Sequence, residues 1–250
     1  MQPAASRDVF DDLETEDERL EAVLASLSEV SWASPSAATG WSTVDVVLHL
    51  AQTDEAVVQT VAGSTAPELW ASPRAATLDE VMDRAVRSQS APANVVFDRW
   101  KKARRAASMA LRKADPARAI PWVAAPIRPR TLATTRLAEH WAHGLDIAGP
   151  LGASFPDTDR LFHDAWLGHS SLPSALSLLG EAPHPVFCEL SGPGGDTWTF
   201  GPSDADSAIR GPAGEFCRVG AQRLAPEASN LKAEGPHGAV TLRALRNYAA

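Results

Sequence analysis

Apolar residues recur at steps of three and four over residues 8–30, which is the spacing of one face of an α-helix. This face comprises Val9, Leu13, Leu20, Val23, Leu24 and Leu27. Pro35 and Gly40 then interrupt the pattern. A second, strongly apolar run extends to about residue 62. It begins at Ser42, and Asp45 follows three residues later, which is the spacing of a capping box.

Further helical patterns follow. Thr77 is a good N-cap for a short helix, and a long helix is expected from just after Pro92 to about residue 114. Another is expected over 134–149, with Thr134 or Thr135 as its N-cap. The intervening segments 63–76 and 115–130 are a loop and a proline-rich crossover. Four long helices and one short helix joined in this way predict a helical bundle with crossovers.

The pattern changes after Pro150. One more helix is expected over about 157–179, followed by the strands PVFCEL and DTWTFGP on either side of the turn SGPGG. SAIRG predicts a third short strand, and closing helices are expected over 214–224 and 238–249. We therefore expect an α plus α+β protein, with an all-α bundle over residues 1–150 and a small α+β domain over residues 151–250.

Composition narrows the class of protein. The chain has 250 residues, of which 44% are hydrophobic, so it can bury a substantial core. The net charge of −8, without a block of Lys or Arg, argues against nucleic acid or an anionic membrane as the main partner. The acidic N-terminus lacks the apolar segment of a signal peptide, and no apolar run is long enough to span a membrane. Cys188 and Cys217 do not form a disulfide framework. A reduced, cytoplasmic protein is expected.

Three residues could hold a metal ion. His49 lies about two turns into a very apolar helix, where an imidazole needs a hydrogen bond or a metal. Glu139 and His143 are four residues apart and project from one helix face. Together they would supply three ligands and leave an open position, as in catalytic zinc sites, although iron(II), nickel or manganese would also fit. The alternative is a core histidine and an unrelated solvent-facing Glu–His pair.

Other residues near these three could assist. Asp146, three residues after His143, or Asp45, four residues before His49, could orient an imidazole. For Asp45, helix capping is the simpler interpretation. His140 is rotated by about 100° from the neighbouring Glu139. A surface position is the simpler interpretation of His140, and an accessory acid/base role makes it a candidate catalytic residue.

Two segments resemble a known family. GWSTVDVVLHLAQTDEAV and RLAEHWAHGLDIAGPLG are similar to the two signatures of the DinB/YfiT-like metal-binding superfamily, in the actinobacterial branch of the mycothiol-dependent maleylpyruvate isomerase. WTFGPSDA and IRGPA resemble that branch more loosely, and the similarity lapses over 62–77 and 115–130.

The resemblance implies a fold and a set of site residues. It implies a DinB-like, up-down four-helix bundle with His49, Glu139 and His143 as metal ligands, followed by a small α/β domain that covers the site. The family's isomerases use the thiol mycothiol, and an arginine near the C-terminus helps to hold the anionic substrate or thiol. Arg223 is the matching residue here, although it could be an ordinary surface arginine. His140 stands where relatives often have a small or hydroxyl residue.

A bound divalent ion would lower the pKa of a water or a thiol and so generate a nucleophile near neutral pH. Neither cysteine is placed to serve as that nucleophile. We therefore predict a metal-dependent enzyme, with zinc as the first choice, that uses a mycothiol-like thiol for isomerisation or S-transfer on a small electrophile. A metal-dependent hydrolase or lyase acting through bound water, or a non-catalytic metal- or ligand-binding protein, is the alternative. A small-molecule partner and a monomer or homodimer are expected.

Overall fold

The computed structural model describes residues 7–64, 77–123 and 125–247 and divides the chain into two compact units. The first unit is Val9–Phe155, and the second consists of residues 156–247 with residues 7 and 8. The boundary therefore falls five residues after the one expected from the sequence. Most of the predicted loop 63–76, the extreme N-terminus and residues 248–250 lie outside the described residues.

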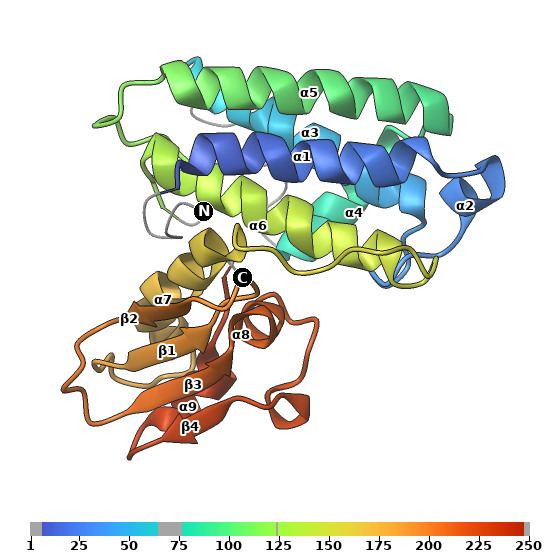
Figure 1. Ribbon diagram of the computed structural model, residues 1–250. Helices are drawn as coiled ribbons and strands as arrows, with labels where there is room; N and C mark the ends of the chain where they lie inside the picture. Colours follow the sequence, from blue (N-terminus) through green and yellow to red (C-terminus); the bar gives the residue numbers. More distant parts are fainter. Residues whose placement is uncertain (1–6, 65–76, 124, 248–250) are drawn as a thin grey trace. The chain divides into compact units, whose positions relative to one another are not determined.

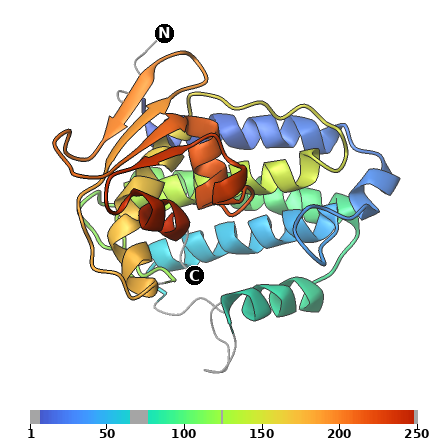
Figure 2. The ribbon, with the colours of Figure 1, turned by 90° about the horizontal axis from the view of Figure 1, so that it is seen from below.

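The first unit is a bundle of four long helices, α1, α3, α5 and α6 (Figure 1). Their bounds are Val9–Ala25, Thr43–Val61, Ala93–Lys113 and Pro129–Ala148. Two shorter helices, α2 (Glu29–Ala33) and α4 (Leu78–Ser88), precede and follow α3, and Figure 2 shows α4 on the outer side of α3. Helix α1 packs along α6, and α3 packs along α5. This confirms the predicted four-helix bundle.

The predicted helix starts at Ser42 and Thr77 are confirmed. The backbone N–H of Ser42 donates to Asp45 over 2.9 Å, which completes a capping box at the start of α3. Thr77 and Glu80 form a second capping box at the start of α4. Asp45 therefore acts as a cap, as the simpler interpretation of its spacing indicated.

Two other helix bounds were predicted wrongly. The helix expected over residues 8–30 ends at Ala25, because Ser28 accepts a hydrogen bond from the backbone of Ser31 and begins the separate helix α2. Helix α6 begins at Pro129, before the predicted caps, because proline suits the first position of a helix. Thr134 lies inside this helix and its hydroxyl donates to the carbonyl of Arg130.

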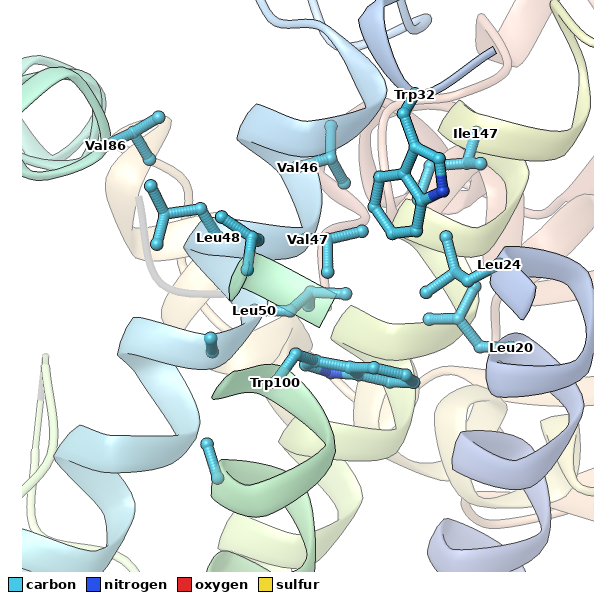
Figure 3. Packing of buried hydrophobic residues seen from close by; sticks show 13 residues of the cluster. Leu20, Leu24, Trp32, Val46, Val47, Leu48, Leu50, Val86, Trp100 and Ile147 are labelled. Carbon is cyan, nitrogen blue, oxygen red and sulfur yellow. The ribbon is translucent and has the colours of Figure 1, made fainter. Parts of the chain in front are cut away.

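Large side chains from several helices fill the bundle (Figure 3). Trp100 of α5 is completely buried against Leu20 and Leu24 of α1 and Leu50 of α3. At about 25 cal/mol per Å² of apolar surface, burying side chains of this size supplies much of the driving force for helix packing.

The second unit combines helices with a four-stranded sheet in the order β2-β1-β3-β4. Its elements are α7 (Leu161–Leu178), β1 (Phe187–Ser191), β2 (Thr197–Phe200), β3 (Ala208–Pro212), α8 (Ala213–Gly220), η3 (Pro226–Ala228), β4 (Lys232–Glu234) and α9 (Gly238–Ala244). Strand β1 pairs antiparallel with β2 and parallel with β3, and β3 pairs antiparallel with β4. The predicted hairpin, third strand and α plus α+β fold class are confirmed.

Four details of this unit differ from the prediction. Helix α7 starts at Leu161, about four residues later than expected, α8 ends at Gly220 rather than at 224, and α9 ends at Ala244 rather than at 249. Strand β4 was missed because its three residues are all exposed and carry no alternation of apolar and polar side chains.

Cys188 and Cys217 are buried, free cysteines. Among the described residues, no helix is long and apolar enough to cross a membrane.

Candidate metal centre

His49, Glu139 and His143 meet inside the bundle, where the first half of α3 faces the second half of α6. The Nε2 atoms of His49 and His143 lie 3.6 and 3.5 Å from Oε2 of Glu139. One ligand atom from each of the three residues lies within 4.8 Å of the others. The structure thus brings together the three residues that the sequence suggested as metal ligands, from positions about 90 residues apart in the chain.

The spacing of these atoms suits a chelated ion. Ligands bound tetrahedrally to zinc at about 2.0–2.1 Å lie about 3.3 Å from one another. The observed 3.5 and 3.6 Å are close to this value and long for hydrogen bonds. Two imidazoles and one carboxylate form a donor set that zinc and several other divalent transition metals accept. The residues therefore fit the metal that the family implies.

The two imidazoles differ in their support. His143 donates from Nδ1 to Oδ2 of Asp146 over 2.9 Å, which leaves its Nε2 directed at Glu139. This is the carboxylate–histidine arrangement that orients metal ligands, and the sequence suggested it. The ring of His49 lies 5.1 Å from the ring of Trp41, tilted by 46° to it, and its buried Nδ1 has no hydrogen-bond partner among the described residues. Asp45, the other suggested support, caps its helix instead.

The surrounding charges keep Glu139 ionised. Burial alone would raise the pKa of Glu139, but the two histidines and Arg136 outweigh it and hold the pKa well below the ordinary value. Burial lowers the pKa of His49, which favours the neutral imidazole that a metal requires. Burial would also lower the pKa of His143, but Asp146 and Glu139 outweigh it, so that pKa is raised. The protonated form of His143 therefore competes with metal binding.

The three side chains are not equally accessible. Those of His49 and His143 are 10% and 11% exposed, whereas that of Glu139 is 30% exposed. The site therefore opens to solvent on the Glu139 side.

His140 is not a surface residue, contrary to the simpler interpretation of its spacing. It is 1% exposed, and its Nδ1 donates to the carbonyl of Arg136 over 2.8 Å. Its Nε2 lies 3.2 Å from Nε1 of Trp100. Asp17 of α1 and Trp100 of α5 cover this face of α6, and the rotation angle alone could not show that they would. A catalytic role for His140 stays a prediction.

Sequence reasoning missed two polar residues next to the centre, Asp54 of α3 and Arg136 of α6. They form a buried ion pair in which Arg136 Nε donates to Asp54 Oδ1 over 2.9 Å. Asp54 lies five residues after His49, and Arg136 lies three residues before Glu139. The presence of Asp54 in the strongly apolar α3 was the signal that could have indicated a buried partner.

Arg223, the predicted substrate- or thiol-binding residue, lies in the second unit just after α8. It is exposed and donates to the carbonyl of Ala221 over 2.6 Å. The preceding Gln222 has a φ of 59°, a left-handed conformation that ends the helix. The binding role of Arg223 stays a prediction.

The fold and the site together define a class of protein, a helical bundle in which two histidines and a glutamate form a candidate metal-binding set. Residues 13–148 match the family described as the mycothiol maleylpyruvate isomerase N-terminal domain. The chain belongs to this family, and the resemblance found in the sequence is confirmed. Two relatives from two strains of Mycobacterium tuberculosis, the uncharacterized proteins MT0041 and Rv0036c, are each 35% identical over 228 residues, covering 90% of this chain and 88% of theirs.

Solved structures of similar fold extend the comparison to the second unit. Two crystal structures of the mycothiol-dependent maleylpyruvate isomerase, one of them a mutant, superpose with TM-scores of 0.61 and 0.60. They are 13% and 12% identical to this chain, and each match covers 94% of this chain and 99% of the other. The similarity in fold thus extends over both units, and the prediction of an enzyme agrees with the isomerase for which the family is named.

Proposed function

We propose that this protein is a metal-dependent enzyme that uses a low-molecular-weight thiol, of the mycothiol type, to isomerise a small electrophile or to transfer sulfur to it. The convergence of His49, Glu139 and His143 within 4.8 Å, in a chain of the mycothiol maleylpyruvate isomerase family, carries this proposal. Zinc is the first choice of metal because two imidazoles, one carboxylate and an open position are typical of its catalytic sites.

The residues of the chain have defined roles in this proposal. Nε2 of His49, Nε2 of His143 and the carboxylate of Glu139 would hold the ion, and Asp146 keeps the His143 ring in place. The metal would supply Lewis acidity, which lowers the pKa of a thiol and favours thiolate at neutral pH. The protein itself supplies no thiolate, because Cys188 and Cys217 are buried in the second unit and burial raises the pKa of each. The nucleophile therefore comes from outside the chain.

Arg223 is the proposed cation for the anionic part of the thiol or substrate. Its guanidinium is permanently charged and reaches the surface of the second unit. A carboxylate on the ligand would form charge-assisted hydrogen bonds with it.

A metal-dependent hydrolase or lyase is the second candidate. The same three ligands would hold a metal that acidifies a water molecule, and the side chain of Glu139 is 30% exposed to solvent. The two candidates differ in whether turnover requires an added thiol.

Elemental analysis of the purified protein tests the metal centre. We expect about one divalent ion per chain and loss of that ion in His49→Ala, Glu139→Ala and His143→Ala, each of which should remain folded by circular dichroism. His184→Ala is the matched control, because that histidine lies in the second unit and bonds Thr241. Full metal occupancy in all three ligand variants would refute the proposed centre.

Thermal unfolding with and without mycothiol tests the thiol. A thiol that binds only the folded protein raises the unfolding midpoint by mass action. We expect millimolar mycothiol to raise the midpoint of the metal-loaded protein, and Arg223→Ala to reduce the increase without changing the metal content. Turnover without thiol, together with an unchanged midpoint, would favour the hydrolase or lyase.

A further inference from the structure

One carboxylate of α3 contacts two residues of α6 that lie on either side of Glu139. Oδ1 of Asp54 accepts from Nε of Arg136 over 2.9 Å, and Oδ2 lies 3.2 Å from Nε2 of His140. The side chains of all three residues are no more than 2% exposed. These two contacts join the helix that carries His49 to the helix that carries Glu139 and His143.

The positions along the helices make this contact a constraint on register. Helices α3 and α6 run in opposite directions. The backbone N–H of Ala37, which precedes α3, donates to the carbonyl of Asp146 near the end of α6, so the start of α3 lies beside the end of α6. Asp54 lies about 7.5 Å along α3 from His49, at 1.5 Å per residue. Arg136 and His140 are four residues apart and share a face of α6. A slide of one helix along the other would break both contacts of Asp54 and also separate His49 from Glu139.

We propose that Asp54 is a positioning residue that fixes the register of α3 against α6. In this role, which rests on the metal centre proposed above, Asp54 holds His49 at ligand distance from Glu139 and His143. Apolar contacts between helices are non-directional, so they define register less sharply than a hydrogen bond between charged groups, such as the one from Arg136 to Asp54.

The surroundings of Asp54 favour the charged and fixed state. Burial would raise the pKa of Asp54, but Arg136 and His140 outweigh burial and hold the pKa below its ordinary value. His140 is itself held by the carbonyl of Arg136 and by Trp100 of α5. Buried ion pairs often add little to stability compared with apolar packing, and a role in specifying register is their best attested use.

Cobalt(II) is a suitable probe, because its visible absorption reports both metal affinity and ligand geometry. The experiment titrates the full-length apoprotein with Co²⁺ for the wild type, Asp54→Ala and Asp54→Asn. The matched control is Val57→Ala, which removes a fully buried side chain one turn further along α3 in a cluster without ligand residues. Circular dichroism and urea unfolding record the fold and stability of each variant.

We expect Asp54→Ala to weaken Co²⁺ binding by about 10–100-fold and to change the absorption spectrum, as for other residues that support metal ligands. Asp54→Asn should have a smaller effect, because its carbonyl oxygen can still accept from Arg136. Val57→Ala should lower stability but leave affinity and spectrum unchanged. If Asp54→Ala does not fold, the Co²⁺ affinity and absorption spectrum of Asp54→Asn test the positioning role.

The outcomes separate this inference from the proposed function. Wild-type affinity and spectrum in the folded Asp54 variants, or the same loss of affinity in Val57→Ala, would overturn the positioning role and leave the metal centre intact. Failure of the wild-type chain to bind Co²⁺ would instead overturn the metal centre, and the positioning role with it.

Discussion

The Nδ1 of His143 donates a hydrogen bond to Oδ2 of Asp146 over 2.9 Å, within a single turn of α6. This bond selects the tautomer and the ring orientation of His143, so its Nε2 faces Glu139. The sequence motif that spans Glu139 and Asp146 therefore contains two of the three candidate ligands and the support for one of them.

Removal of that support should weaken the metal centre. We expect Asp146→Ala to reduce zinc affinity by about 10–100-fold, because the His143 ring is then free to rotate. Asp146→Asn should lose less, since its carbonyl oxygen can still accept from Nδ1. Competition with a chromophoric chelator measures both affinities. Asp98→Ala, which removes an exposed carboxylate, is the control. A zinc affinity of Asp146→Ala equal to that of the wild type would contradict the role of Asp146 in supporting His143.

The stability of the bundle should depend on pH through Asp17. Burial raises the pKa of Asp17 to about 7, although His140 and Arg104 oppose the increase. The folded state therefore holds a proton that the unfolded state releases near pH 4, so stability falls as the pH rises from about 4 to 7. We expect Asp17→Asn, which mimics the protonated acid, to match the wild type near pH 4. By pH 8 it should be more stable, on the order of 2–4 kcal/mol.

Urea unfolding of both proteins across this pH range measures the difference in unfolding free energy. Asp98→Asn, which removes an exposed carboxylate on α5, should change stability by less than about 1 kcal/mol at every pH. A constant difference between Asp17→Asn and the wild type would show that Asp17 does not titrate in this range.

Gly144 should tolerate no side chain. A Cβ at this position would lie 2.4 Å from the ring of Phe155, so the ring or the helix must move. We expect Gly144→Ala to lower the unfolding free energy by about 1–3 kcal/mol. In a Phe155→Ala background the clash is absent, and the same substitution should stabilise α6 by up to about 1 kcal/mol through helix propensity. Equal effects in the two backgrounds would exclude the clash as the cause.

A fragment comprising Val9–Phe155 should fold and bind metal. It contains the apolar clusters of the bundle and all three candidate ligands. We expect a cooperative unfolding transition and about one zinc ion per fragment, but no thiol-dependent turnover, because Arg223 lies in the other unit. Thermal unfolding and metal analysis test the first expectation. Turnover equal to that of the full chain would contradict a catalytic contribution from the second unit.

Local patterns in the sequence determined most of the helices and the candidate metal ligands. Helical periodicity depends on neighbours three and four residues away, and capping boxes such as Ser42–Asp45 depend on residues three apart. The pairing of Glu139 with His143 is equally local. The addition of His49 to this pair came from the requirements of a buried imidazole and from the family resemblance.

Only the tertiary structure decided which polar residues are buried and which helices contact one another. His140 has the spacing of a surface residue, yet it is enclosed because Trp100 packs over it from another helix. Asp54 meets Arg136 across 82 positions in the chain, and no local rule connects them. Strand β4 exists through its pairing with β3, since its exposed residues carry no pattern. Burial and long-range pairing arise when helices and strands pack together, so no short stretch of sequence contains them.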